Sequence, residues 1–223
     1  MMQTRFEKKA GLALVVFTVL MIFTMVLHPA GGSVEYLLTI IPLIVITHAI
    51  AILSLPFALA GFWGLTKAIG TDNFLSILAF SFISLGLVAV MIAAAANGLV
   101  MPLFIQTYKD ASVETIALIK PVLRYSFSVN HAFDYIYTGA FCLAIMCWSI
   151  TILYTKKLPV WVGWFGIIIS TAAIVIFITA PGMFGLHAVR LFVSCIVLWI
   201  LVVGIVLNQK PDVRKSANTE PDN

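Results

Sequence analysis

Charged residues are scarce in this sequence, and their scarcity excludes a water-soluble domain. Of its 223 residues only 10% are Asp, Glu, Lys or Arg, whereas 62% are hydrophobic. Soluble domains are about a quarter charged, which is what covers their surface in water. This chain therefore needs lipid as its solvent. At roughly 20 residues per span, its length allows six spans, and we predict an all-α, polytopic transmembrane helical bundle.

Cysteine and the motifs of soluble enzymes are also scarce. Three cysteines, Cys142, Cys147 and Cys195, lie in apolar runs without C-x-x-C spacing, which argues against a disulfide framework or a dithiol redox site. We find no Gly-rich phosphate loop, no nucleophile elbow and no H-E-x-x-H pattern. The basic residues are spread over short tails and loops, so we expect no nucleic-acid partner.

Six apolar segments, bounded by charged residues, glycine or proline, are predicted to span the membrane. They cover about 10–27, 36–65, 74–100, 126–154, 159–180 and 184–207. We expect one six-helix domain over 1–207 and a disordered cytoplasmic tail over 208–223. The first segment has the basic start of a secretory signal, but its apolar core is long and its cleavage site poor, so we expect an anchor.

The cations predict the orientation. With the N-terminus in the cytoplasm, nine of the thirteen lie on the cytoplasmic side, which follows the positive-inside rule. The C-terminus is then cytoplasmic as well. The five tryptophans fall in the inner half and three tyrosines at the outer boundary, as in interfacial belts. The nine are Arg5, Lys8, Lys9, Lys67, Lys156, Lys157, Lys210, Arg214 and Lys215, and the other four are Lys109, Lys120, Arg124 and Arg190.

The longest connection, 101–125, is predicted to lie outside the cell. Asp110 or Ser112 is placed to cap a short helix, and Pro121 to end it. Such a segment is either an interfacial lid or an ordinary surface connection.

Ionisable residues inside spans are costly and are functional candidates by default. His131 and Asp134 are three residues apart, and His187 and Arg190 repeat that spacing in the last segment. At 1.5 Å per residue, Asp134 and Arg190 both lie roughly 10–12 Å below the outer surface, so we predict that they pair. The candidate ligand-binding set is His48, Asn97, Asn130, His131, Asp134, His187 and Arg190.

Each polar residue also has a structural interpretation. Asp134 with Arg190 would fix helix register, and His48 would be a neutral histidine bonded to a backbone carbonyl. His28, before Pro29 in a turn, is interpreted as a surface residue. His131 and His187 could instead ligate haem or a metal ion, and a His–Asp pair could serve a membrane enzyme as general base.

The preferred interpretation is a polar pocket open to the extracytoplasmic side. It is enclosed by the second, third, fourth and sixth segments and entered beneath the 101–125 connection. Its ligand would be a small molecule or a lipid-like amphiphile, and the protein a sensor, a binding module or a small permease. The sequence names neither the ligand nor the oligomeric state.

Two stretches carry a family resemblance. One runs Leu158-Pro159-Val160-Trp161-Val162-Gly163-Trp164-Phe165-Gly166, and the other is His48 followed by Leu55-Pro56 and Gly61-Phe62-Trp63-Gly64-Leu65. They resemble a bacterial family of six-helix integral membrane proteins classed as a domain of unknown function. The resemblance implies a protein of the bacterial inner (plasma) membrane and carries no known active site.

Overall fold

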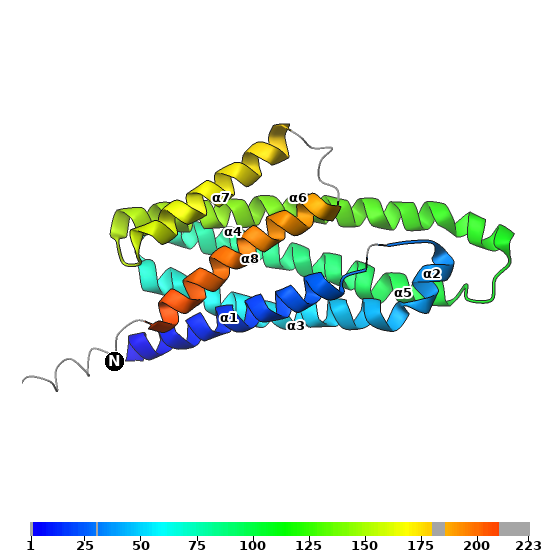
Figure 1. Cartoon of the computed structure of the whole chain (residues 1–223), viewed down its shortest axis with the longest axis horizontal. Coiled ribbons are helices and arrows are strands. Elements are labelled where there is room, and N and C mark those ends of the chain that lie inside the picture. The colour runs from blue at the N-terminus through cyan, green and yellow to red at the C-terminus, as the bar shows by residue number, and fades with distance from the viewer. Residues whose placement is uncertain (1, 30, 180–185, 210–223) are drawn as a thin grey trace, which may run out of the picture.

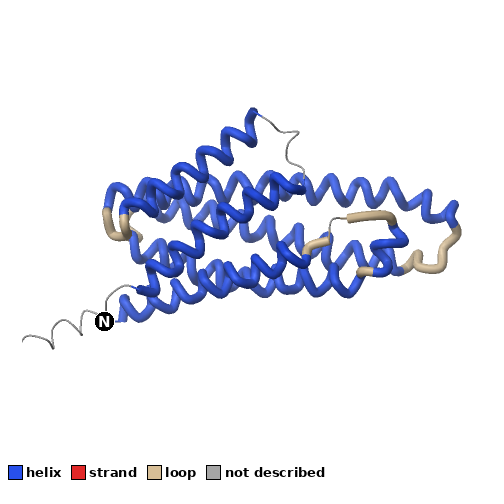
Figure 2. The backbone as a smooth tube through the Cα atoms, in the orientation of Figure 1, coloured by secondary structure: helices blue, strands red, loops and turns tan. Residues whose placement is uncertain are grey.

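A computed structural model describes residues 2–29, 31–179 and 186–209, and for residues 2–4, 177 and 186–191 it describes the backbone only. The regular elements in these ranges are all helices, as predicted, and Figure 2 shows no strand among them. In chain order they are α1 (Met2–Leu27), α2 (Val34–Thr39), α3 (Ile41–Ile69), α4 (Phe74–Ala95), the π-helical turn η1 (Ala96–Val100), α5 (Met101–Gln106), α6 (Val113–Thr155), α7 (Val160–Thr179) and α8 (Leu186–Gln209). The predicted tail falls largely in 210–223, outside the described residues.

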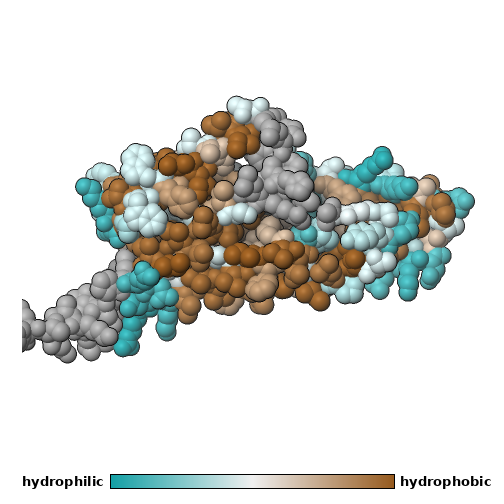
Figure 3. Space-filling model, in the orientation of Figure 1, coloured by the Kyte–Doolittle hydropathy of each residue, from teal (hydrophilic) through white to brown (hydrophobic). Residues whose placement is uncertain are grey.

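Several of these helices are long and apolar enough to cross a membrane. Within the described ranges they are Arg5–Leu27, Ile41–Ile69, Phe74–Gln106, Val113–Thr155 and Phe192–Gln209, and the apolar stretch Val160–Ile176 is shorter. Large apolar side chains cover much of the surface, with Leu53 61% and Leu85 64% exposed. Figure 3 shows them as a broad band across the middle of one face, with hydrophilic residues toward the two ends. A band of this kind is typical of a lipid-solvated bundle.

The helices form an elongated bundle (Figure 1). The start of α1 and the end of α8 lie together at one end, called here the terminal end, where a Cβ on Gly11 would come within 2.8 Å of the Asn208 backbone nitrogen. The opposite end, called the far end, is built by α2, α5 and the start of α6. The glycines therefore let α1 and α8 pack backbone to backbone.

Proline divides the second predicted segment. Pro42 stands in the first turn of α3, where its missing N–H costs nothing, whereas inside a continuous helix its ring would clash with the preceding turn. The chain therefore breaks at Ile40, between α2 and α3. The short α2 folds over the far end of the bundle, where Ser33 caps it by accepting a hydrogen bond from the Tyr36 backbone N–H at 3.3 Å.

The predicted outer loop is largely helical, which corrects the sequence prediction. Ser112 does cap a helix, accepting from the Thr115 backbone N–H at 3.3 Å, but that helix passes through Pro121 and continues to Thr155. Ile119 and Leu123, on either side of the proline, are buried in a far-end core with residues of α2, α3 and α5. Packing on both sides holds the helix together across the missing hydrogen bond. Only Thr107 to Ser112 remain as a connection.

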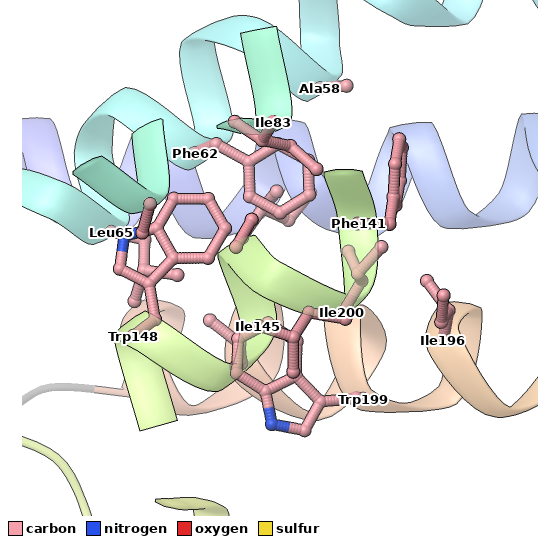
Figure 4. Packing of buried hydrophobic residues seen from close by; sticks show 14 of the residues in the cluster. Ala58, Phe62, Leu65, Ile83, Phe141, Ile145, Trp148, Ile196, Trp199 and Ile200 are labelled. Atoms are coloured by element: carbon pink, nitrogen blue, oxygen red, sulfur yellow. The ribbon is translucent and has the colours of Figure 1, made fainter. Parts of the chain in front are cut away.

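The main core fills the terminal half of the bundle. Figure 4 shows Phe62, Trp148 and Trp199 stacked at its centre, with ring centroids 5.1 and 6.4 Å apart. Trp148 Nε1 donates to Thr66 Oγ1 at 3.2 Å, and Trp199 Nε1 donates to the Val162 carbonyl at 3.1 Å. Because both indoles are fully buried, the prediction that all five tryptophans form an interfacial belt is wrong. Its exposed members are Trp63, Trp161 and Trp164.

Candidate functional site

A cavity of about 130 Å³ lies in the far half of the bundle, beside the main core. Helices α3, α4, α6 and α8 contribute to its wall. The first segment contributes as well, since α1 supplies Phe17, Met21, Thr24 and Met25. Its wall is mainly apolar rather than polar, which changes the kind of ligand that it fits.

The polar wall residues gather at one end of this cavity. His28, just after the end of α1, lies farther toward the far end than Phe17 of α1, and Asn97 of η1 lies farther than Val90 of α4. On α6, which runs in the opposite direction, Asn130 and Asp134 precede Phe141. The floor toward the terminal end is apolar and includes Phe17, Phe141, Ile196 and Ile200, all members of the main core. The cavity is therefore amphiphilic along its length.

The side chain of His48 contacts the backbone of α3 and also lines this cavity. It is 6% exposed, and its Nδ1 lies 2.7 Å from the Ile44 carbonyl oxygen. That contact is the one expected for a structural histidine, yet the ring also lines the cavity. The π-helical turn η1 passes it closely at Gly98, where an added Cβ would overlap the Cβ of His48. Glycine at 98 is thus required for His48 to occupy this position.

His28 is the residue that the sequence prediction missed. Its ring centroid lies 5.2 Å from that of His48, its Nδ1 lies 3.0 Å from the Pro29 carbonyl oxygen, and it lines the cavity. The interpretation as a simple surface residue is therefore wrong. The sequence could have indicated this contact through the helix order. When two successive long helices pack antiparallel, the end of the first lies beside the start of the second.

Asn97 reaches the cavity from an irregular turn. It lies in η1, where the helix widens by one residue just before Pro102. Proline cannot donate to the turn before it, and π-helical turns are one way in which a helix accommodates such a break. The Oδ1 atom of Asn97 is buried and accepts no hydrogen bond from any residue that the structure describes. Unsatisfied buried acceptors are uncommon and are often met at functional sites.

Asp134 and Asn130 occupy adjacent turns of α6. Asn130 Nδ2 donates to Asp134 Oδ2 at 3.4 Å, and the Asp134 side chain is 24% exposed. Both side chains line the cavity. The long hydrogen bond leaves the carboxylate able to accept stronger ones.

His131 departs from that stripe. Its side chain is 48% exposed, its Nδ1 lies 3.6 Å from Asp134 Oδ2, and its ring lies against Tyr135 with centroids 4.8 Å apart. It is not among the cavity-lining residues. Side chains three residues apart on a helix point in directions that differ by about 300°, which is about 60° short of a full turn. Two residues of one stripe can therefore face different surroundings. His131 therefore lies beside the cavity wall rather than in it, and its part in ligand binding stays a prediction.

The remaining two candidates belong to α8. His187 and Arg190 lie in its first turns, but their side chains are outside the described residues. The predicted contact between Asp134 and Arg190 stays a prediction. Among the residues that the structure does describe, no group of three His, Cys, Asp or Glu side chains is placed to hold a metal ion. All three cysteines are free thiols.

Comparison with protein-family models, curated proteins and solved structures found no match to this chain. The family resemblance of the two Gly, Pro and Trp stretches therefore stays a prediction. The fold and the site define a class in physical terms. The chain is an all-helical protein whose apolar helices are suited to a membrane, with an amphiphilic cavity among five of them.

Proposed function

We propose that this chain is an integral membrane protein that binds a small amphiphilic molecule in the cavity among α1, α3, α4, α6 and α8. It spans the membrane six times, with both termini in the cytoplasm and the polar end of the cavity toward the extracytoplasmic side. In this position it acts as a sensor, a binding module or a small permease.

The observation that carries the proposal is the separation of polar and apolar wall residues. An amphiphile binds where its apolar body loses contact with water and its head group meets polar partners. Phe17, Phe141 and Ile200 provide the apolar part, and His48, Asn97 and Asp134 the polar part. An apolar cavity of roughly 150 Å³ accommodates benzene, so a cavity of about 130 Å³ fits a small ring or a short alkyl chain.

The orientation rests on the described cations. Arg5, Lys8, Lys9 and Lys67 are at the terminal end with Lys156 and Lys157, whereas Lys109, Lys120 and Arg124 are at the far end. The positive-inside rule places the end richer in cations in the cytoplasm. The cavity's polar residues then face outward.

The test measures binding of three small probes with one phenyl ring and different head groups: 2-phenylethylamine, 2-phenylethanol and 3-phenylpropanoate. The full-length protein is placed in phosphatidylcholine nanodiscs and titrated by calorimetry, with empty nanodiscs as the blank for partition into lipid. At least one probe is expected to bind saturably.

Two cavity-filling variants locate the binding. Ala93→Leu and Val197→Phe place extra carbons in the cavity, whose wall both residues form, and each is expected to abolish saturable binding. Ala132→Leu, on the exposed side of α6, is the matched control and is expected to bind as the wild type does. Saturable binding that survives both cavity-filling variants, or binding of none of the three probes, would refute the proposed function.

A further inference from the structure

Three residues at the polar end of the cavity, His48, Asn97 and Asp134, offer hydrogen-bond acceptors. His48 Nδ1 lies 2.7 Å from the Ile44 carbonyl oxygen, and a carbonyl oxygen only accepts, so the proton is on Nδ1. In a neutral imidazole the other nitrogen, Nε2, is then an acceptor. The backbone of α3 thus fixes the tautomer of the ring that lines the cavity.

Asn97 and Asp134 add oxygen acceptors to the same end. Asn97 Oδ1 is buried and has no hydrogen-bond donor among the described residues, and leaving such an atom unpaired costs free energy that a donor group would recover. Among the described residues, the Asp134 carboxylate makes two long contacts, 3.4 Å from Asn130 Nδ2 and 3.6 Å from His131 Nδ1, both at Oδ2. An ionised carboxylate accepts hydrogen bonds and donates none.

The described cavity wall contains no lysine or arginine. The hydroxyl of Tyr137, which also lines it, either donates or accepts. The side chain of Arg190 is outside the described residues. Within the described wall, the acceptors of His48, Asn97 and Asp134 carry one formal negative charge.

We infer that the ligand class of this cavity is a protonated primary amine on a small apolar body. This inference rests on the proposed function of the cavity as an amphiphile site. An ammonium head has three N–H donors and a positive charge, which matches three acceptors of which one is an anion. Charge-assisted hydrogen bonds are roughly twice as strong as neutral ones, so the amine is favoured over a neutral alcohol. A carboxylate head would meet acceptors and a like charge.

The experiment is the rank order of the three phenyl probes in the same nanodiscs. We expect 2-phenylethylamine to bind at least tenfold more tightly than 2-phenylethanol, and 3-phenylpropanoate to bind most weakly. Equal or tighter binding of the alcohol or the carboxylate would overturn the inference while leaving the amphiphile site in place. Absence of binding by all three would refute both.

Three variants connect the preference to the residues. Asp134→Asn keeps the shape of the side chain and removes the charge, and should weaken amine binding at least tenfold while leaving alcohol binding within twofold. Asp110→Asn, in the exposed connection before α6, is the matched control and should change neither. Arg190→Gln should leave amine affinity unchanged or raise it. Retained amine preference in Asp134→Asn, or its loss in Arg190→Gln, would contradict the assignment.

Discussion

At the residue scale, the contact between Gly98 and His48 fixes one wall of the cavity. A methyl group at position 98 would overlap the His48 Cβ, which belongs to a buried, backbone-bonded side chain and cannot swing away. Gly98→Ala should therefore destabilise the protein by about 1–3 kcal/mol, the usual cost of overpacking. Thermal unfolding in detergent measures it.

Gly139 provides the matched control for that substitution. It is also helical, but a Cβ there would meet no atom within 4 Å. Since alanine favours a helix by about 0.5–1 kcal/mol over glycine, Gly139→Ala should leave the melting temperature unchanged or raise it. A Gly98→Ala protein as stable as Gly139→Ala would show that η1 and α3 do not meet so closely.

A second test at the residue scale asks whether the side chains of Asp134 and Arg190 are in contact, as the sequence predicts. If the two side chains are buried together, removal of either one leaves an isolated charge at a cost of about 3–5 kcal/mol. If the two are paired, Asp134→Asn and Arg190→Gln each lower thermal stability and the double variant loses less than the sum of the two; if Asp134 is instead free to hold the amine inferred above, the losses add. Strictly additive losses would argue against contact, because independent sites add.

At the element scale, α6 is the feature that differs most from the sequence prediction. Its 43 residues extend about 64 Å at 1.5 Å per residue, roughly twice the 30 Å hydrocarbon core of a bilayer. Its first turns therefore form a rigid projection at the far end rather than a loose lid. The far-end core with α2 and α5 supports this projection.

Hydrogen exchange tests the helical state of that projection. Backbone amides from Ile116 to Arg124, apart from Pro121, should be protected because they are hydrogen-bonded within α6 and packed on Ile105 and Leu37. Amides of Asp110 and Ser112, which are exposed and donate no backbone hydrogen bond within the described residues, should exchange much faster and serve as the internal reference. Equal exchange rates in the two segments would mean that the original loop prediction is correct.

At the scale of the whole molecule, the start of α1 and the end of α8 lie at one end of the bundle (Figure 1). Combined with the cation distribution, this predicts a cytoplasmic location for both termini. A reporter enzyme that is active only in the cytoplasm should work when fused after Lys215 and fail when inserted near Lys109. The reverse pattern of activity would invert the topology, and with it the side that the cavity faces.

The sequence alone determined the features that depend on local composition. Few charges and long apolar runs predict membrane helices, because charged side chains are costly in the hydrocarbon core of a bilayer and apolar side chains are favoured there. The Ser112 cap was predictable from one residue and the turn that follows it. Asn97, Asn130 and Asp134 stood out because polar groups inside apolar runs need a reason, and the structure places them along the cavity with His48.

Only the tertiary structure decided what depends on the neighbour across the bundle. His28 lies against His48 because α1 and α3 are antiparallel, and His131 turns away from the cavity although it shares a stripe with Asp134. Trp199 is buried beside Gly166 of α7, and Trp148 is buried against Phe62 and Thr66 of α3. These outcomes follow from contacts between residues far apart in the sequence, whose packing energies exceed the local preferences of proline, tryptophan and histidine.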